Sequence, residues 1–287
     1  MRERGAFVLG AVAYDPKVVA IWDGFQSYFE RNGLAFDYVL FTNYERQVEA
    51  HFAGQIDIAW NSPLAWLQAE RIAAALGRRV EAVCMRDTDR DLTSAILVRS
   101  DGELQKVADL KGKRVAVGAH DSPQATLIPL DFIADGGLIP GRDFEVRYFD
   151  LLVGKHGDHI GGEREAARAL LRGDVDAACM IDSNVLLFAQ EATLPSGSTR
   201  VLAHTPAYDH CNFTVLDGAP AGSVQRFREL LLAMSYSDPD VRPLLDMEGL
   251  KRWMPGRTAG YGALSAALDR FGTVDEFVLF ASARTCA

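Results

Sequence analysis

Short apolar runs alternate with amphipathic runs over the first sixty residues. The run from Phe7 to Val12 is continuously apolar, as is typical of a strand buried on both faces. Val18 to Asn32 carries apolar residues at helical spacing and is closed by the C-cap signal Asn32-Gly33. The same order then repeats, with a strand predicted at Phe36 to Phe41, a helix at Tyr44 to Phe52 and a strand at Gln55 to Trp60. This order predicts a parallel sheet covered by helices on both faces.

A second α/β pattern begins after residue 92. Thr93 to Arg99 has the pattern of a strand, and a polar, turn-rich passage follows it. Further strands are predicted at Arg114 to Gly118, Phe144 to Phe149 and Val175 to Ile181, with a helix at Glu163 to Arg172. We interpret this stretch as a second lobe.

The chain is then expected to return to the first lobe through Arg200 to His204 and Asn212 to Leu216. Helical patterns at Val224 to Met234, Pro239 to Asp246 and Gly262 to Phe271 are expected to pack on that lobe. The predicted fold is α/β, with residues 1–95 and 212–287 in lobe 1 and residues 96–211 in lobe 2. The two lobes are expected to be joined by two hinge crossings, near residues 94–99 and 204–212, and to enclose a central cleft. Ligands of such lobes bind outside the carboxyl ends of the strands.

Composition narrows the possible partners. The 287 residues are 48% hydrophobic and carry a formal net charge of -9, so nucleic acid and anionic membranes are poor partners. No apolar stretch approaches the ~20 residues of a membrane span, so no membrane insertion is expected. A small anion stays possible, because the amino ends of helices attract anions whatever the net charge.

The start of the chain and its cysteines bear on the cellular compartment. Met1 to Arg4 and the apolar run Gly5 to Ala13 imitate a signal peptide, but the run is too short for one. Cys84, Cys179, Cys211 and Cys286 show no paired spacing, so reduced thiols are expected, with Cys179 in the core. The sequence predicts a cytoplasmic protein, or a periplasmic one if the apolar run is misjudged.

Uncharged hydrogen-bonding residues follow the predicted strands. Two loops, Asn61-Ser62-Pro63 and Ser122 to Thr126, combine hydroxyls with the unpaired N–H groups of a helix start, which can hold a small oxyanion. The alternative is that each loop is only a helix cap. The candidate ligand-binding residues are Tyr14, Tyr44, Asn61, Ser62, Ser122, Gln124, Ala125, Thr126, His156, His159, Asp182 and Tyr208.

Four segments carry a resemblance to a known family: Ile56 to Trp66 (IDIAWNSPLAW), Leu104 to Gly118, Asp121 to Thr126 and Gly173 to Ala178. In order and spacing the chain resembles the phosphate, phosphite and phosphonate substrate-binding proteins of ABC importers, over most of Phe7 to about Leu216. The resemblance implies a type II periplasmic-binding-protein fold and, if the protein is exported, an ABC permease as partner. It also implies that Asn61 and Ser62 face the ligand from one lobe, and that Ser122, Gln124, Ala125 and Thr126 cup it from the other. His156 or His159 would contact its oxygens.

The polar run from Gly154 to Glu163 also suggests a metal site. His156, His159 and Glu163 are ligand types for a divalent transition metal, and His210 and Cys211 could approach them across the cleft. Alternatively, the run only hydrogen-bonds an anion and caps a helix, because HxxH in a loop is a weak signal. No cofactor is certain. The alternating charges of Arg86 to Asp91 lack the glycine and distal glutamate of a calcium loop, so a solvated or salt-bridged turn is expected there.

Three functions remain open. The first is a solute-binding protein for a small phosphonate-like anion. The second is a cytoplasmic enzyme on the same fold that uses His156, His159, His210 or Cys211, with or without a metal. Cys211 and His210 could be a nucleophile and its base, but neighbours in an extended segment point to opposite faces and are not expected to pair. The third is a ligand sensor that reports to a partner.

Overall fold

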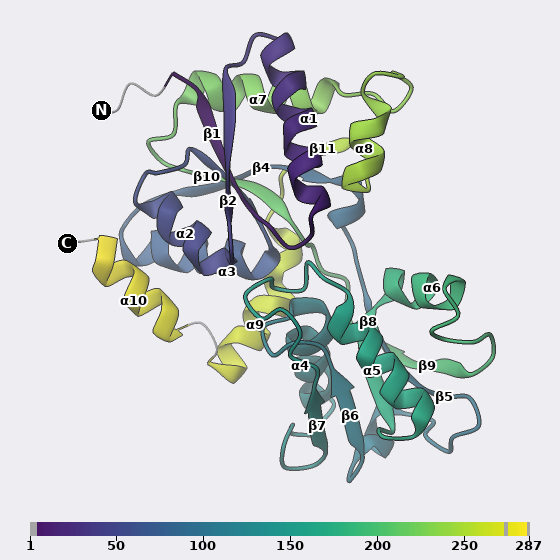
Figure 1. Ribbon diagram of the computed structural model, residues 1–287. Helices are drawn as coiled ribbons and strands as arrows, with labels where there is room; N and C mark the ends of the chain where they lie inside the picture. Colours follow the sequence, from purple (N-terminus) through teal and green to yellow (C-terminus); the bar gives the residue numbers. More distant parts are fainter. Residues whose placement is uncertain (1–4, 273–274, 286–287) are drawn as a thin grey trace. The chain divides into compact units, whose positions relative to one another are not determined.

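The computed structural model describes residues 5–272 and 275–285, which divide into two compact units (Figure 1). Within the described residues, unit 1 takes residues 5–90, Asp209–Gly260 and 275–285, and unit 2 takes Asp91–Tyr208 and Tyr261–Gly272. The sequence predicted divisions after residues 95 and 211, and the units divide after Arg90 and Tyr208. The segment Tyr261–Gly272 adds a second stretch of chain to unit 2.

The described residues of unit 1 contain one six-stranded sheet, with the spatial order β11-β4-β10-β3-β1-β2. Its strands are β1 (Phe7–Val12), β2 (Phe36–Phe41), β3 (Ile58–Asn61), β4 (Val80–Arg86), β10 (Asn212–Leu216) and β11 (Trp253–Pro255). The strands predicted in the first sixty residues are confirmed, and Asn212 to Leu216 returns to this unit as expected. The sequence patterns predict neither β4 nor β11. The expectation of a parallel sheet is confirmed for β1, β2 and β3, the strands from which it was drawn, and does not extend to the rest of the sheet. β10 runs antiparallel to β3 and β4, because this part of the chain re-enters the sheet from the opposite direction.

Helices cover both faces of this sheet, which explains why β1 is apolar throughout. On one face, α1 (Lys17–Arg31), α7 (Ala221–Ala233) and α8 (Arg242–Glu248) pack around a core that includes Phe25 and Phe227. On the other, α2 (Tyr44–Phe52), α3 (Pro63–Ala75) and α10 (Asp275–Thr285) pack over a smaller core (Figure 1). A short 3₁₀ turn, η1 (Asp87–Asp89), follows β4.

The described residues of unit 2 contain a five-stranded sheet in the spatial order β7-β6-β8-β5-β9. Its strands are β5 (Ser94–Arg99), β6 (Arg114–Val117), β7 (Glu145–Tyr148), β8 (Ala177–Ile181) and β9 (Thr199–His204). β5, β6, β7 and β8 lie at the predicted strand positions, and β9 lies at the stretch Arg200 to His204, where a return to the first lobe is expected. β9, however, belongs to this sheet and pairs with β5, so it is not a return to the first lobe.

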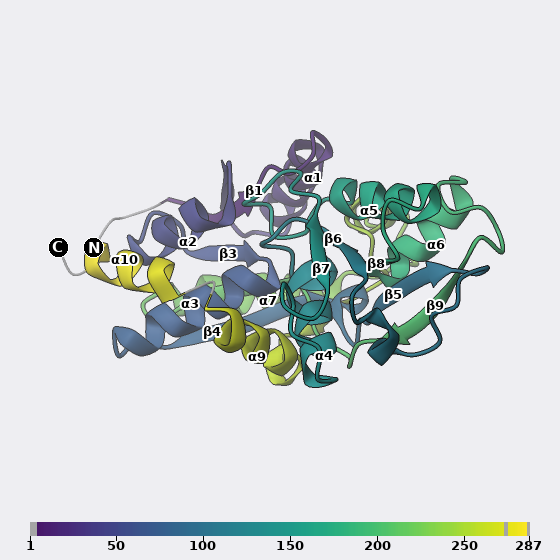
Figure 2. The same ribbon diagram turned by 90° about the horizontal axis from the view of Figure 1, so that it is seen from below.

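Figure 2 shows α5 (Gly161–Arg172) and α6 (Asp182–Gln190) on one face of this sheet. On the other face lie α4 (Ile128–Asp135) and α9 (Gly262–Phe271). The expectation that α9 packs on the first lobe is wrong. Phe271 packs against the core of unit 2, and Arg270 forms ion pairs with Asp131 and Asp135 of α4. The remaining short turns are η2 (Val107–Leu110), η3 (Pro123–Leu127) and η4 (Ala259–Tyr261).

Local signals explain where several helices begin. The Asn43 side chain accepts a hydrogen bond from the Arg46 N–H at 2.9 Å, and the Ser62 hydroxyl accepts one from Ala65 at 3.1 Å, with Pro63 as the first helical residue. The Ser62 cap confirms the helix start predicted at Asn61-Ser62-Pro63. Among the described helices, none combines the length and the apolar character that spanning a bilayer requires.

Candidate functional site

In unit 1, the predicted site residues follow strands that point the same way. β1, β2 and β3 are parallel, so Asn61, at the carboxyl end of β3, and Tyr14 and Tyr44, just beyond β1 and β2, lie at one edge of the sheet. Tyr14 is partly buried, whereas Tyr44 is only 1% exposed and packs in the core beneath α2 and α3. Tyr44 therefore contributes to the core of unit 1.

Both polar ends of the Asn61 side chain are engaged inside unit 1. Its Oδ1 accepts a hydrogen bond from Gln47 Nε2 at 2.8 Å, and its Nδ2 donates to Thr214 Oγ1 at 3.0 Å. The Thr214 hydroxyl in turn donates to Asn212 Oδ1 at 2.7 Å. All four residues are fully buried, so this chain of hydrogen bonds joins α2, β3 and β10 at this edge of the sheet. The sequence does not predict that Gln47, Asn212 and Thr214 join this network, because no local pattern links residues so far apart in the chain.

In unit 2, polar residues also gather at one edge. β6, β7 and β8 are parallel, and their carboxyl ends lead into Ser122, the 150–160 loop and Asp182. β5 is antiparallel to β8, so its first residue, Ser94, lies at the same edge. The Asp182 carboxylate is paired with His204 at 3.2 Å and accepts a hydrogen bond from Thr93.

A helix start lies directly beyond β6. The Ser122 hydroxyl accepts a hydrogen bond from the Ala125 N–H at 3.2 Å, and the Leu127 N–H reaches back five residues to the Ser122 carbonyl at 3.0 Å. This contact makes η3 a π-helical turn, which continues into α4. Gly118 is required here, because a Cβ at that position would lie 2.8 Å from the Cβ of Ala125. The positive end of the helix dipole thus meets the end of the strand.

Behind this helix start lies a buried polar cluster. Gln124 Nε2 donates to the Gly157 carbonyl at 2.7 Å and to Glu163 Oε1 at 3.3 Å. The other oxygen of Glu163 accepts from the Ile181 N–H at 3.0 Å and from Asn184 Nδ2 at 2.8 Å. Glu163 is therefore a hydrogen-bonded carboxylate that anchors the 154–163 loop.

Tyr208 and Thr126 complete the polar cluster around Gln124. The Tyr208 hydroxyl lies 2.7 Å from Ser94 Oγ, which also donates to the Gln124 carbonyl at 2.6 Å. Burial raises the pKa of Tyr208, so its phenol stays protonated. The Thr126 hydroxyl donates to the Ala119 carbonyl at 2.7 Å. Each predicted polar residue of this loop is thus already part of a hydrogen-bonded framework.

The two histidines of the 154–160 loop have different environments. His156 is fully buried with a left-handed backbone, φ 48°, whereas His159 is partly exposed. Burial lowers the pKa of His159, although Asp121 acts in the opposite direction. In the described part of the chain, His156, His159 and Glu163 do not come together as a group of metal ligands.

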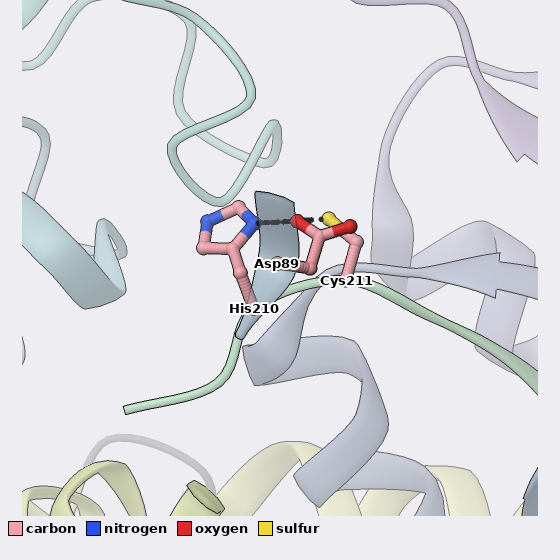
Figure 3. Close-up of side chains that lie close together, drawn as sticks. All are labelled: Asp89, His210 and Cys211. Atoms are coloured by element: carbon pink, nitrogen blue, oxygen red, sulfur yellow. Dashed lines mark hydrogen bonds and ion pairs between the residues drawn. The ribbon is translucent and has the colours of Figure 1, made fainter. Parts of the chain in front are cut away.

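A different set of metal-ligand side chains does meet in unit 1. Asp89, His210 and Cys211 place one ligand atom each within 4.8 Å of the others, and all three are buried (Figure 3). His210 Nδ1 lies 3.1 Å from Cys211 Sγ, so the expectation that these neighbours point apart is wrong. The two residues precede β10 rather than lying within it, and the alternation of side chains along a strand does not apply there.

The Asp89 carboxylate is strongly acidic. Burial alone would raise its pKa, but the Arg86 guanidinium, together with His210, outweighs burial and lowers the pKa of Asp89 to about 2. Arg86 holds the carboxylate through two hydrogen bonds, of 2.5 and 2.9 Å. The charged patch at residues 86–91 is thus a salt-bridged turn, as expected, but its key acid is buried rather than solvated.

The geometry does not favour a nucleophile and base at Cys211 and His210. The imidazole nitrogen that faces Cys211 is also the one that lies 3.5 Å from Asp89 Oδ1. A catalytic relay needs the thiol on one ring nitrogen and the carboxylate on the other. Cys179 is buried in β8, as predicted, and burial raises its pKa to about 12. Cys286 lies outside the described residues.

Two lobes of mixed α/β structure, each with polar helix starts beyond its strands, define a protein of the periplasmic-binding class. The chain matches the family model described as "ABC transporter, phosphonate, periplasmic substrate-binding protein" over residues 10–261, and it belongs to that family. It is therefore a solute-binding protein, as the sequence predicted, and the enzyme alternative is not favoured.

The expectation of a cytoplasmic protein is wrong, because this family is periplasmic. The apolar run at the start was correctly interpreted as a strand, but a strand carries no information about the compartment. Residues 1–4 lie outside the described part of the chain.

Solved structures with related folds agree with the type II periplasmic-binding-protein fold. PhnD1 from Prochlorococcus marinus, solved with methylphosphonate, is 17% identical, with a TM-score of 0.69 over 93% of this chain and 98% of its own. A protein from Xanthomonas citri, solved with ATP, is 16% identical, with a TM-score of 0.71 over 95% and 100%. The aliphatic sulphonate-binding protein SsuA from Escherichia coli is 20% identical, with a TM-score of 0.57 over 94% and 93%. At these identities the likeness concerns the fold.

Proposed function

We propose that this protein captures a phosphonate, phosphate or phosphite at the helix start formed by Ser122 to Thr126, and delivers it to an ABC permease. The observation that carries the proposal is the Ser122-capped amino end of η3 and α4, directly beyond β6. The first N–H groups of a helix have no partner inside the helix, and the dipole makes this end attractive to anions.

The Ser122 hydroxyl can serve the cap and the ligand together. Its oxygen accepts a hydrogen bond from Ala125, which leaves the hydroxyl hydrogen for an oxygen of the ligand. Ser122 is 2% exposed, and a hydrogen bond to an anion is stronger away from water. Fixed dipoles of this kind suit a chain of net charge -9, because they attract the anion locally.

The test is calorimetry with methylphosphonate, phosphate and phosphite on the wild type and on Ser122→Ala. Loss of one hydrogen bond to a charged ligand predicts a Kd raised about 10- to 100-fold. Ser198→Ala, which removes a surface hydroxyl of the same unit, is the control and leaves the Kd unchanged. Equal affinities for wild type and Ser122→Ala would refute this site.

Ser62 is the matching candidate in unit 1. It caps α3 as Ser122 caps η3, again with proline as the first helical residue. A weakened Kd for Ser62→Ala, measured alone and together with Ser122→Ala, would add this second helix start to the ligand site.

A further inference from the structure

Asp89, His210 and Cys211 come together because two strand ends adjoin. β4 and β10 are antiparallel neighbours, so the turn that follows β4 meets the residues that precede β10. The His210 N–H donates to the Asp89 carbonyl at 2.8 Å, which fixes the two backbones. The three side chains then converge from these two segments (Figure 3).

We propose that Asp89, His210 and Cys211 bind a divalent transition metal of the zinc class. Bond lengths of roughly 2.0–2.3 Å to nitrogen, oxygen and sulfur put neighbouring ligand atoms of a tetrahedral site about 3.4–3.6 Å apart. The distances from His210 Nδ1, 3.1 Å to Cys211 Sγ and 3.5 Å to Asp89 Oδ1, are close to those values. Three protein ligands leave a fourth position for water or a small anion.

The local charges suit a dication. Arg86 contacts two carboxylates. It donates to Asp89 through Nε and Nη2, and its Nη1 lies 3.4 Å from Glu248 Oε1. One positive and two negative charges leave a net charge of −1 before the metal arrives. When the metal binds, the Cys211 thiol loses its proton to solvent and a metal–sulfur bond forms, so the net charge becomes −2 and balances the dication.

Arg86 also orients the carboxylate ligand. A carboxylate oxygen has two lone pairs, so Oδ1 of Asp89 can bind the metal while it accepts the 2.9 Å hydrogen bond from Arg86. Such outer hydrogen bonds typically fix the ligands of metal sites. A ligand set of one thiolate, one imidazole and one carboxylate selects zinc or cobalt over magnesium or calcium.

The site lies where the chain passes between the two units. Asp89 precedes the division after Arg90 by one residue, and His210 and Cys211 follow the division after Tyr208. The three ligands all belong to unit 1, whereas the helix start at Ser122 belongs to unit 2. Metal binding and phosphonate binding are measured with separate probes. Failure of one proposal leaves the other intact.

The experiment titrates Co²⁺ into untagged, chelator-treated full-length protein and then displaces it with Zn²⁺. We expect one Co²⁺ per chain with a thiolate-to-cobalt charge-transfer band, and release of about one proton per metal, from Cys211, in calorimetry across buffers. Cys211→Ser should abolish the band, and His210→Gln should weaken binding by at least about tenfold. Cys84→Ser removes a thiol that is not among the three proposed ligands and should leave the band unchanged.

Two results would overturn the proposal. One is a wild-type protein without the charge-transfer band. The other is a band that survives in Cys211→Ser, which would place the metal elsewhere. If Cys211→Ser fails to fold by circular dichroism, His210→Gln and the wild-type spectrum decide the question.

Discussion

Gln124 and Gly157 are held against each other in unit 2. The Gln124 amide donates to the Gly157 carbonyl at 2.7 Å, and a Cβ on Gly157 would overlap that amide. Gly157 also has φ 83°, a conformation that glycine adopts without strain. The contact fixes the loop that carries both candidate histidines beside the helix start of the proposed phosphonate site.

Gly157→Ala should therefore cost more than a backbone penalty. Gly197 is the matched control, because its φ is 76° and a Cβ there meets nothing within 4 Å. We expect Gly197→Ala to cost about 1 kcal/mol of unfolding free energy and Gly157→Ala about 2–4 kcal/mol, since Gln124 must also move. Denaturant unfolding measures both, and equal losses would show that the contact with Gln124 is unimportant.

Asn61→Ala should destabilise unit 1. The variant removes two buried hydrogen bonds, so one N–H of the Gln47 amide loses its acceptor and the Thr214 hydroxyl loses a donor. Gln47 still donates to the Trp60 carbonyl and Thr214 to Asn212, and we expect a loss of about 2–4 kcal/mol. Asn43→Ala removes only the cap of α2 and should cost about 1 kcal/mol. Thermal unfolding followed by tryptophan fluorescence compares the two. A loss for Asn61→Ala no larger than that of the cap variant would contradict the buried network.

Acid should weaken the fold through His51. Burial lowers the pKa of His51 to about 3, opposed by a hydrogen bond with the Asp57 backbone and aided by the charge of Arg78. Because the unfolded chain takes up this proton near pH 6.5, stability is full above that pH and falls as the pH drops toward 3. We expect His51→Gln to lose less stability than the wild type between pH 7 and 5. Parallel stability curves for the two proteins would refute this assignment.

Arg86→Lys should be costly although it keeps the charge. Lysine cannot reproduce the two-pronged contact with Asp89 or the stacking of the guanidinium 5.2 Å from the Trp60 ring centre. We expect a loss of about 2–4 kcal/mol. Arg142→Lys alters an exposed pair with Asp143 and should change stability by less than about 0.5 kcal/mol. Urea titrations of both variants provide the comparison.

Leu268→Ala should affect unit 2 selectively. Leu268 is fully buried in α9, and its truncation should cost about 2–4 kcal/mol. All four tryptophans, Trp22, Trp60, Trp66 and Trp253, belong to unit 1, so helix dichroism should shift more than tryptophan fluorescence. Leu279→Ala, at an exposed position of α10, is the control and should shift neither signal. Equal shifts in both signals would contradict the assignment of α9 to unit 2.

Local patterns predicted the elements well. Ser62-Pro63, Asn43 and the apolar run of β1 each determine their own segment through capping or burial, and all three agree with the structure. What escaped the sequence depends on distant partners. Asn61 forms a hydrogen bond with Thr214, 153 positions away in the sequence. Similarly, α9 packs in unit 2, where Arg270 forms ion pairs with Asp131 and Asp135. The pairing of His210 with Cys211 depends on where β10 begins, which periodicity fixes only to within a few residues.

The π-helical turn at Pro123–Leu127 affects how this part of the chain can change in length. A π-helical turn holds one residue more than an α-helical turn. The side chains of α4 therefore point in the same directions as they would in an uninterrupted α-helix with one residue fewer at this turn. Deleting one residue here would leave Leu130 and Ile133 directed into the core while displacing Ser122 and Gln124. Evolution could therefore vary the start of this helix, where we propose that the anion binds, by single-residue insertion or deletion without repacking the interior beneath it.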